Sequence, residues 1–144
     1  MNDNPDFMMQ TYIRTSPERL WAALTDEHES AAYHFLGAAT RTACEKGGRF
    51  DQGFPDGTLM LGGKIIDVEP NKRLEVTFEP NWGENPGAVS RYVCEIDHLG
   101  DHCCLTVSHY DLIEDQEGVA DGWARQLSSL KSYLETGQKL KFAA

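Results

Sequence analysis

The sequence predicts an α+β domain in which a strongly curved antiparallel sheet of seven strands wraps around one long C-terminal helix. Residues 119–135 place large apolar side chains four, four, three and four positions apart, which makes one stripe along a helix. Between residue 37 and that helix, short segments alternate apolar and polar side chains, as half-buried strands do. A helix with one apolar stripe and a sheet with one apolar face cover each other.

The chain is predicted to open with a strand and two short helices. Residues 7–15 read as the strand. Its more apolar face, predicted to point inward, consists of Phe7, Met9, Thr11 and Ile13. Ser16 is a good N-cap and Pro17 suits the first position of a helix. A second short helix is expected around residues 27–35, and Gly37 ends it.

Six further strand segments follow, separated by turn residues. They are residues 39–45, 48–53, 59–69, 72–80, 90–97 and 103–111. The pair Gly62–Gly63 is expected to bend the long third segment, as a wrapped sheet requires. Together with the first strand, these segments make seven. Gly137 is the predicted stop of the long helix.

Length and charge limit the classes of function. The 144 residues fit one domain, with a core over about residues 7–137. A net charge of −10 disfavours nucleic acid and anionic membranes as partners. The start of the chain shows no secretory signal, and no apolar run is long enough to span a bilayer. We therefore expect a cytoplasmic protein whose four cysteines are thiols.

No motif for a metal, a cofactor or a nucleophile stands out. His98, His102 and Cys103 flank one tight turn, but a fourth metal ligand is not evident. The glycine pairs lack the lysine of a phosphate-binding loop, and no nucleophile elbow occurs. We expect no metal and no cofactor.

The space between the long helix and the sheet is the candidate site, and it is expected to hold a small, mostly apolar molecule. Small residues beside the apolar stripe would keep the helix from filling this space; they are Ala120, Ala124 and Ser128. The predicted wall consists of Leu74, Val76, Phe78, Tyr92, Cys94, Leu105, Val107, His109, Trp123, Leu127 and Leu130.

A few polar and aromatic residues have two interpretations each. His109 follows Leu105 and Val107 at strand spacing, so it is either the polar group that binds the ligand or a structural histidine bonded to a loop or to the long helix. Tyr92 either presents its hydroxyl to a ligand or packs in the core. Trp82 either gates the cavity mouth or folds onto the sheet edge. Three further residues are candidates near the cavity or its rim, namely His34, Arg41 and Arg91.

Four motifs carry a resemblance to a known family. They are RTSPERLWAALTD, DVEPNKRLEVTF, LTVSHYD and GWARQLSSLKSYLETG. Together they resemble the Hsp90 ATPase activator homologue (AHSA1-like) branch of the START/Bet v 1-like (SRPBCC) superfamily, over about residues 10–137. The resemblance implies the helix-grip fold, with a cavity that often binds an apolar small molecule.

The resemblance also implies two alternatives to simple ligand binding. One is a chaperone-interaction module of the Hsp90-activator type, for which only the acidic segment 111–121 could serve. The other is an enzyme of the cyclase or dehydratase kind, with His109 or Tyr92 as acid–base group. Catalysis needs at least two converging polar groups, and the sequence supplies one at best, so binding is the preferred prediction. Homodimerisation is left open.

Overall fold

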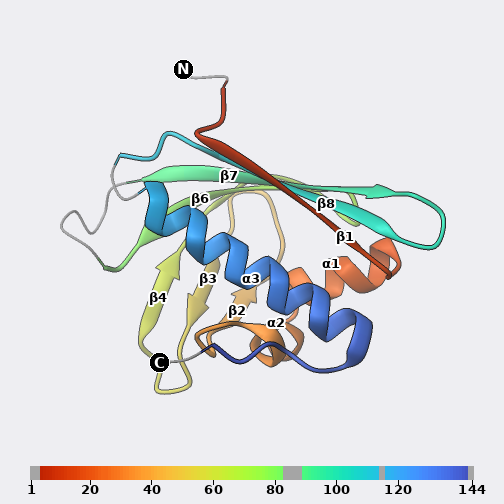
Figure 1. Cartoon of the computed structure of the whole chain (residues 1–144). Coiled ribbons are helices and arrows are strands. Elements are labelled where there is room, and N and C mark those ends of the chain that lie inside the picture. The colour runs from red at the N-terminus through yellow and green to blue at the C-terminus, as the bar shows by residue number, and fades with distance from the viewer. Residues whose placement is uncertain (1–3, 83–88, 114–115, 143–144) are drawn as a thin grey trace.

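The computed structural model describes residues 4–82, 89–113 and 116–142. Its elements in chain order are β1 (Phe7–Ile13), α1 (Pro17–Thr25), α2 (Glu27–Tyr33), β2 (Ala39–Thr42), β3 (Phe50–Gly53), β4 (Leu59–Gly62), β5 (Ile65–Glu69), β6 (Arg73–Pro80), β7 (Ser90–His98), β8 (Cys103–Tyr110) and α3 (Gln116–Thr136). Helix α3 runs across one face of a curved sheet, with α1 and α2 beside its C-terminal half (Figure 1). This is the predicted α+β helix-grip arrangement.

The sheet is antiparallel throughout, with the strand order β1-β8-β7-β6-β4-β3-β2. Strand β5 pairs with β6 beside this path, so eight segments stand where seven strands were predicted. The difference lies in the predicted strand 59–69, which is interrupted between β4 and β5. Both segments pair with β6 one after the other, so they follow the course expected of one bent strand.

Gly63 explains the bend. A Cβ atom at this position would lie 2.8 Å from the carbonyl oxygens of Phe50 and Thr77 and from a methyl group of Val76. Real Cβ atoms essentially never come so close to backbone oxygens, so the backbones can approach one another here only around a glycine.

The two short helices are joined at Asp26. Ser16 caps α1, because its hydroxyl oxygen accepts a hydrogen bond from the Arg19 amide at 3.1 Å. The Asp26 amide ends α1 by donating to the Ala22 carbonyl, and its carboxylate caps α2 by accepting from the Glu29 amide at 2.9 Å. Helix α2 ends two residues before the predicted limit at 35.

The predicted inward and outward faces of β1 are confirmed. Met8 and Tyr12 are 58% and 53% exposed, whereas Ile13 is fully buried.

Helix α3 begins three residues earlier than predicted, at Gln116, and Gly137 follows its end with a φ of +85°. The part of the chain that the structure describes contains no helix long and apolar enough to cross a membrane.

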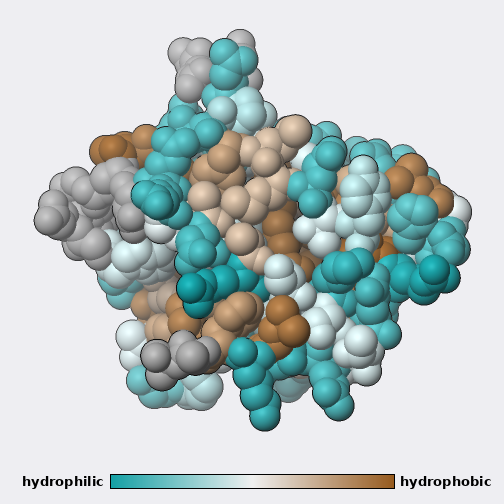
Figure 2. Space-filling model, in the orientation of Figure 1, coloured by the Kyte–Doolittle hydropathy of each residue, from teal (hydrophilic) through white to brown (hydrophobic). Residues whose placement is uncertain are grey.

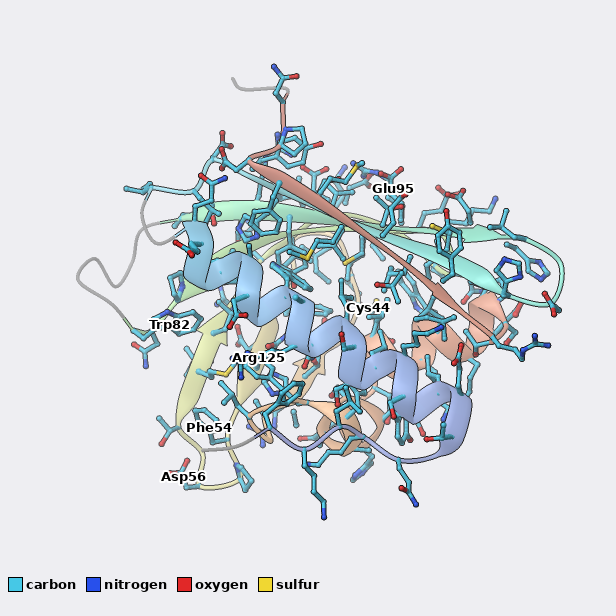
Figure 3. All side chains as sticks on the ribbon, viewed as in Figure 1. Cys44, Phe54, Asp56, Trp82, Glu95 and Arg125 are labelled. Carbon is cyan, nitrogen blue, oxygen red and sulfur yellow. The ribbon has the colours of Figure 1, made fainter. Side chains whose placement is uncertain are left out.

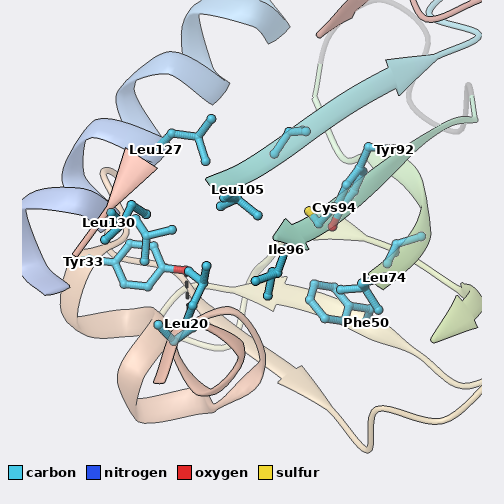
Figure 4. Close-up of a cluster of buried hydrophobic side chains, with 14 of the residues drawn as sticks. Leu20, Tyr33, Phe50, Leu74, Tyr92, Cys94, Ile96, Leu105, Leu127 and Leu130 are labelled. Atoms are coloured by element: carbon cyan, nitrogen blue, oxygen red, sulfur yellow. Dashed lines mark hydrogen bonds between the residues drawn. The ribbon is translucent and has the colours of Figure 1, made fainter. Parts of the chain in front are cut away.

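The main core lies under the second half of α3. Leu127 and Leu130 of this helix face Leu105 of β8 (Figure 4), and all three are nearly or fully buried. Tyr33 enters the same core from α2, and its hydroxyl donates to the Ala23 carbonyl at 3.0 Å. The deep half of the helix–sheet interface is therefore filled with side chains.

The chain after Gly137 turns back along the helices (Figure 1). Ser129, which is completely buried, holds this tail in place: its hydroxyl donates to the Tyr33 carbonyl at 2.6 Å and accepts from the Leu140 amide at 3.2 Å. Further along, the Phe142 ring packs edge-on against Phe35, with centroids 6.3 Å apart. The fold thus uses residues beyond the predicted core limit of 137.

Candidate ligand cavity

A cavity of about 540 Å³ lies beside the first half of α3. Six parts of the chain supply its wall: the α2–β2 connection, β3 with β4, the end of β6, β7, the first three turns of α3 and the C-terminal tail. The lining residues are His34, Phe35, Leu36, Gln52, Met60, Leu61, Phe78, Trp82, Tyr92, Gly118, Val119, Asp121, Gly122, Trp123, Arg125, Gln126 and Phe142. We call this space the outer cavity. Figure 2 shows apolar residues gathered below α3, near the end of the tail.

A second, much smaller space of about 30 Å³ lies deeper between α3 and the sheet; we call it the inner void. Four residues line both spaces and so separate them, namely Gln52, Tyr92, Trp123 and Gln126. The Tyr92 and Trp123 rings meet edge to face, with centroids 4.9 Å apart. These two rings form the apolar part of the partition.

The eleven predicted wall residues are divided between these places. Phe78, Tyr92 and Trp123 line the outer cavity. Tyr92 and Trp123 also line the inner void, together with Leu74, Cys94, Leu105, Val107, Leu127 and Leu130. Val76 and His109 line neither space. The stripe of α3 packs directly on the sheet at its second half, so the open space is displaced towards the start of the helix.

Glycine leaves room beside the helix, rather than the small residues suggested by the sequence. Ala124 and Ser128 are exposed on the outside of α3. Gly118 and Gly122 line the outer cavity, and a Cβ atom at Gly122 would come no closer than 3.8 Å to the Phe35 ring.

His109 is held inside the protein by bonds to both of its ring nitrogens. The Trp123 indole N–H donates to Nδ1 at 3.1 Å, so the proton of the neutral ring sits on Nε2 and is donated to the Ser90 hydroxyl at 2.8 Å. The residue is completely buried, and burial lowers its pKa to about 4. Both nitrogens are engaged, and the ring fixes the orientation of Trp123, as the structural interpretation of this histidine predicted.

His34 lines the outer cavity as a second neutral histidine. Its Nδ1 accepts from the Leu36 amide at 3.0 Å, and its ring stacks on Phe35. Burial lowers its pKa to about 4, although a hydrogen bond with the Gln52 side chain opposes this effect. Arg41, the other predicted rim residue, is not among the lining residues and pairs with Glu27 at 2.6 Å.

Trp82 and Arg125 lie on the cavity side of the molecule, near the first half of α3 (Figure 3). Trp82 is 43% exposed and packs edge-on against Phe78, with centroids 6.0 Å apart. It therefore combines the two interpretations, since it contacts the sheet and also lines the cavity. The rest of its predicted loop, residues 83–88, lies outside the described residues.

Arg125 is already paired within the protein. Its Nε donates to the Asp121 carboxylate at 2.9 Å, and its guanidinium lies 5.4 Å from the centre of the Phe142 ring. The pair places one cation and one anion in the cavity wall, so their charges balance. Arg91, by contrast, pairs with Glu75 at 3.0 Å and is not among the lining residues.

Reactive groups are scarce in the described ranges, 4–82, 89–113 and 116–142. They contain no cluster of His, Cys, Asp and Glu side chains able to hold a metal ion. His98 and His102 bond instead to the Gly100 carbonyl and to Asp101. Burial raises the pKa of the Cys94 thiol to about 12, so this thiol is not a nucleophile at neutral pH.

Sequence reasoning missed most of the wall because its residues carry no periodic signal. Phe35, Leu36 and Phe142 come from connections and from the tail, where no pattern predicts which way a side chain points. Met60 could have been predicted as a wall residue, because it lies in a predicted strand. The sequence did not show that this part of the strand borders the cavity.

Comparison with known proteins supports the fold. The solved structure of CalU16 from Micromonospora echinospora superposes with a TM-score of 0.72 at 19% identity, over 92% of this chain and 75% of that one. The Aha1 dimer from Colwellia psychrerythraea superposes with a TM-score of 0.71 at 22% identity, over 91% of this chain and 96% of that one. DynU16, described as a putative protein in the dynemicin biosynthetic locus, superposes with a TM-score of 0.74 at 20% identity. The match covers 94% of this chain but only 49% of DynU16.

No protein with a curated description matches the sequence. The family model described as "Activator of Hsp90 ATPase homolog 1-like protein" matches residues 14–135, which is most of the chain. The four motifs predicted the same family, and the structure has its helix-grip architecture. The chain belongs to the Activator of Hsp90 ATPase homolog 1-like (AHSA1-like) family.

Proposed function

We propose that this protein binds one small, mostly apolar molecule in the outer cavity. The observation that carries the proposal is a space of about 540 Å³ with aromatic side chains from five separate parts of the chain in its wall. Sites for small molecules generally measure 300–1,000 Å³ and combine apolar walls with a few polar groups. Phe78, Tyr92 and Trp123 of the predicted wall belong to this site, and Phe35 and Phe142 complete it.

Binding is favoured over catalysis by the state of the titratable groups. His34 and His109 are neutral at pH 7, and each accepts a protein N–H at Nδ1. Burial raises the pKa of the Tyr92 hydroxyl well above its usual value of 10, which makes it a weak acid. A cyclase or dehydratase that used His109 would first have to break the bond to Trp123.

No specific observation favours the chaperone-interaction alternative. The acidic segment proposed for it includes residues 114–115, which lie outside the described part of the chain. One solved structure in the comparison is a dimer, and homodimerisation stays open for this protein.

Gly122 offers a direct test, because it lines the outer cavity and a Cβ atom there would make an ordinary van der Waals contact with the Phe35 ring, at 3.8 Å. Gly122→Ala adds one methyl group and should stabilise α3 by about 1 kcal/mol. Gly122→Trp places an indole in the same space. Each variant and the wild type are titrated with the neutral fluorescent probe N-phenyl-1-naphthylamine, and native mass spectrometry reports stoichiometry and any small molecule retained from purification.

The wild type and Gly122→Ala should bind one probe molecule per chain with similar affinity. Gly122→Trp should bind at least tenfold more weakly while keeping a cooperative thermal transition. If folded Gly122→Trp binds like the wild type, the ligand does not occupy the outer cavity and the proposal is wrong.

A further inference from the structure

The polar atoms left without a partner in the cavity wall are mostly hydrogen-bond donors. Tyr92 is the deepest of them. The residue is 3% exposed, and its hydroxyl has no hydrogen-bond partner among the described residues. In the same ranges, no fully enclosed side-chain nitrogen or oxygen lacks a partner, so this hydroxyl borders open space at the partition between the outer cavity and the inner void, both of which Tyr92 lines.

Two amide side chains beside Tyr92 leave N–H groups free. Gln126 uses its carbonyl oxygen to accept the Phe35 amide at 3.2 Å. His34 carries its proton on Nε2, because Nδ1 accepts from the protein backbone, so its hydrogen bond with Gln52 uses the carbonyl oxygen of that side chain. Both glutamines line the partition, and in each the amide nitrogen remains as a donor.

Arg125 adds donors near the Phe142 ring without adding net charge. Its Nε is bonded to Asp121, and its two terminal nitrogens make no hydrogen bond in the described part of the chain. Because Asp121 balances the guanidinium charge, an anionic ligand gains little attraction there and would still lose its hydration on entering an apolar cavity.

We infer that the outer cavity selects a neutral aromatic molecule that carries carbonyl oxygens, with Tyr92 as the residue that determines this specificity from the inner end. The inference rests on the proposed function. A carbonyl oxygen accepts from the Tyr92 hydroxyl or the glutamine amides, whereas an apolar group of the same shape leaves these donors unpaired after water has been expelled.

Three probes of nearly the same size test the inference: 2-acetylnaphthalene, 2-isopropenylnaphthalene and 2-naphthoate. They place a ketone, an alkene and a carboxylate at the same ring position. Isothermal titration calorimetry gives their dissociation constants for the wild type, for Tyr92→Phe and for the control Tyr12→Phe. Tyr12 is half exposed on the outer face of β1, so its hydroxyl does not line the cavity.

The wild type and Tyr12→Phe should bind the ketone at least fivefold more tightly than the alkene, as one hydrogen bond provides. Tyr92→Phe should reduce that preference by about fivefold, because the ketone loses its donor and the alkene no longer leaves a buried hydroxyl unpaired. Equal binding of ketone and alkene by the wild type, an unchanged preference in Tyr92→Phe, or tighter binding of the carboxylate would each overturn the inference while the proposed function stands. If none of the three binds, the proposed function itself fails for aromatic ligands.

Discussion

The buried bond between His109 and Trp123 predicts a specific dependence of stability on pH. His109→Leu replaces the ring with an apolar side chain that does not titrate. The variant leaves the Trp123 N–H without its acceptor and the Ser90 hydroxyl without its donor. Each lost partner costs about 1–2 kcal/mol, so the variant should be about 2–4 kcal/mol less stable than the wild type at pH 7.5.

Acid should reduce this deficit. The pKa of His109 falls from 6.5 to about 4 on folding, so the unfolded chain binds a proton more readily than the folded one. The wild type therefore loses stability as the pH falls below about 6.5, by about 1.4 kcal/mol per pH unit, until the pH reaches about 4. His34 titrates in both proteins, so its contribution cancels in the difference. At pH 4.5 the deficit should have shrunk by about 2–3 kcal/mol.

Urea unfolding, followed by tryptophan fluorescence at pH 7.5, 6.5, 5.5 and 4.5, measures this difference. His28→Leu is the matched control, because His28 is exposed on α2. Acid should shrink the deficit of His109→Leu relative to this control. A deficit for His109→Leu that stays constant from pH 7.5 to 4.5 would refute the argument that burial and the Trp123 bond keep His109 neutral.

Two further substitutions test the architecture. Gly63→Ala should lower the free energy of unfolding by more than about 2 kcal/mol, because its methyl group would lie 2.8 Å from two backbone oxygens that cannot move aside. Thermal unfolding measures this loss, with Gly122→Ala as the tolerated control. An unchanged midpoint would contradict the proposed cause of the bend. Ser16→Ala should lower stability by about 1 kcal/mol, or roughly 3 °C in the midpoint, through loss of the α1 cap. Exposed Ser128→Ala should cause no such loss, and equal midpoints for both serine variants would show that the cap is dispensable.

The fold could be predicted from the sequence because its signals are local and repeated. The stripe on α3 and the alternation along β6 each indicate which face is buried, and the cap at Ser16 indicates where α1 begins. The predicted number of strands, seven, differs from the observed eight for a local reason too. The glycine pair showed where the strand bends, but only the approach of Phe50 and Thr77 shows that pairing is interrupted there.

The site was harder to predict, because burial does not distinguish a packed wall from an open one. Leu127 and Trp123 belong to the same stripe, yet Leu127 packs against the sheet and Trp123 borders open space. Their difference depends on what lies opposite, including Phe35 and a tail residue, Phe142, that is separated from them in sequence. The hydrogen bonds of His109 could not be predicted for a similar reason. Its Nε2 bonds to Ser90, and nothing in the sequence indicates that these two residues are in contact.

The division of α3 into two halves has a consequence for how such proteins can diversify. The fully buried residues of α3 lie in its second half, whereas part of the wall of the outer cavity comes from the α2–β2 connection, two glycines and the tail. Phe142 lies beyond residues 14–135, the part of the chain that the family model matches. Substitutions in that connection and in the tail can therefore reshape the outer cavity without replacing residues of the main core, so the cavity can diverge while the core is preserved.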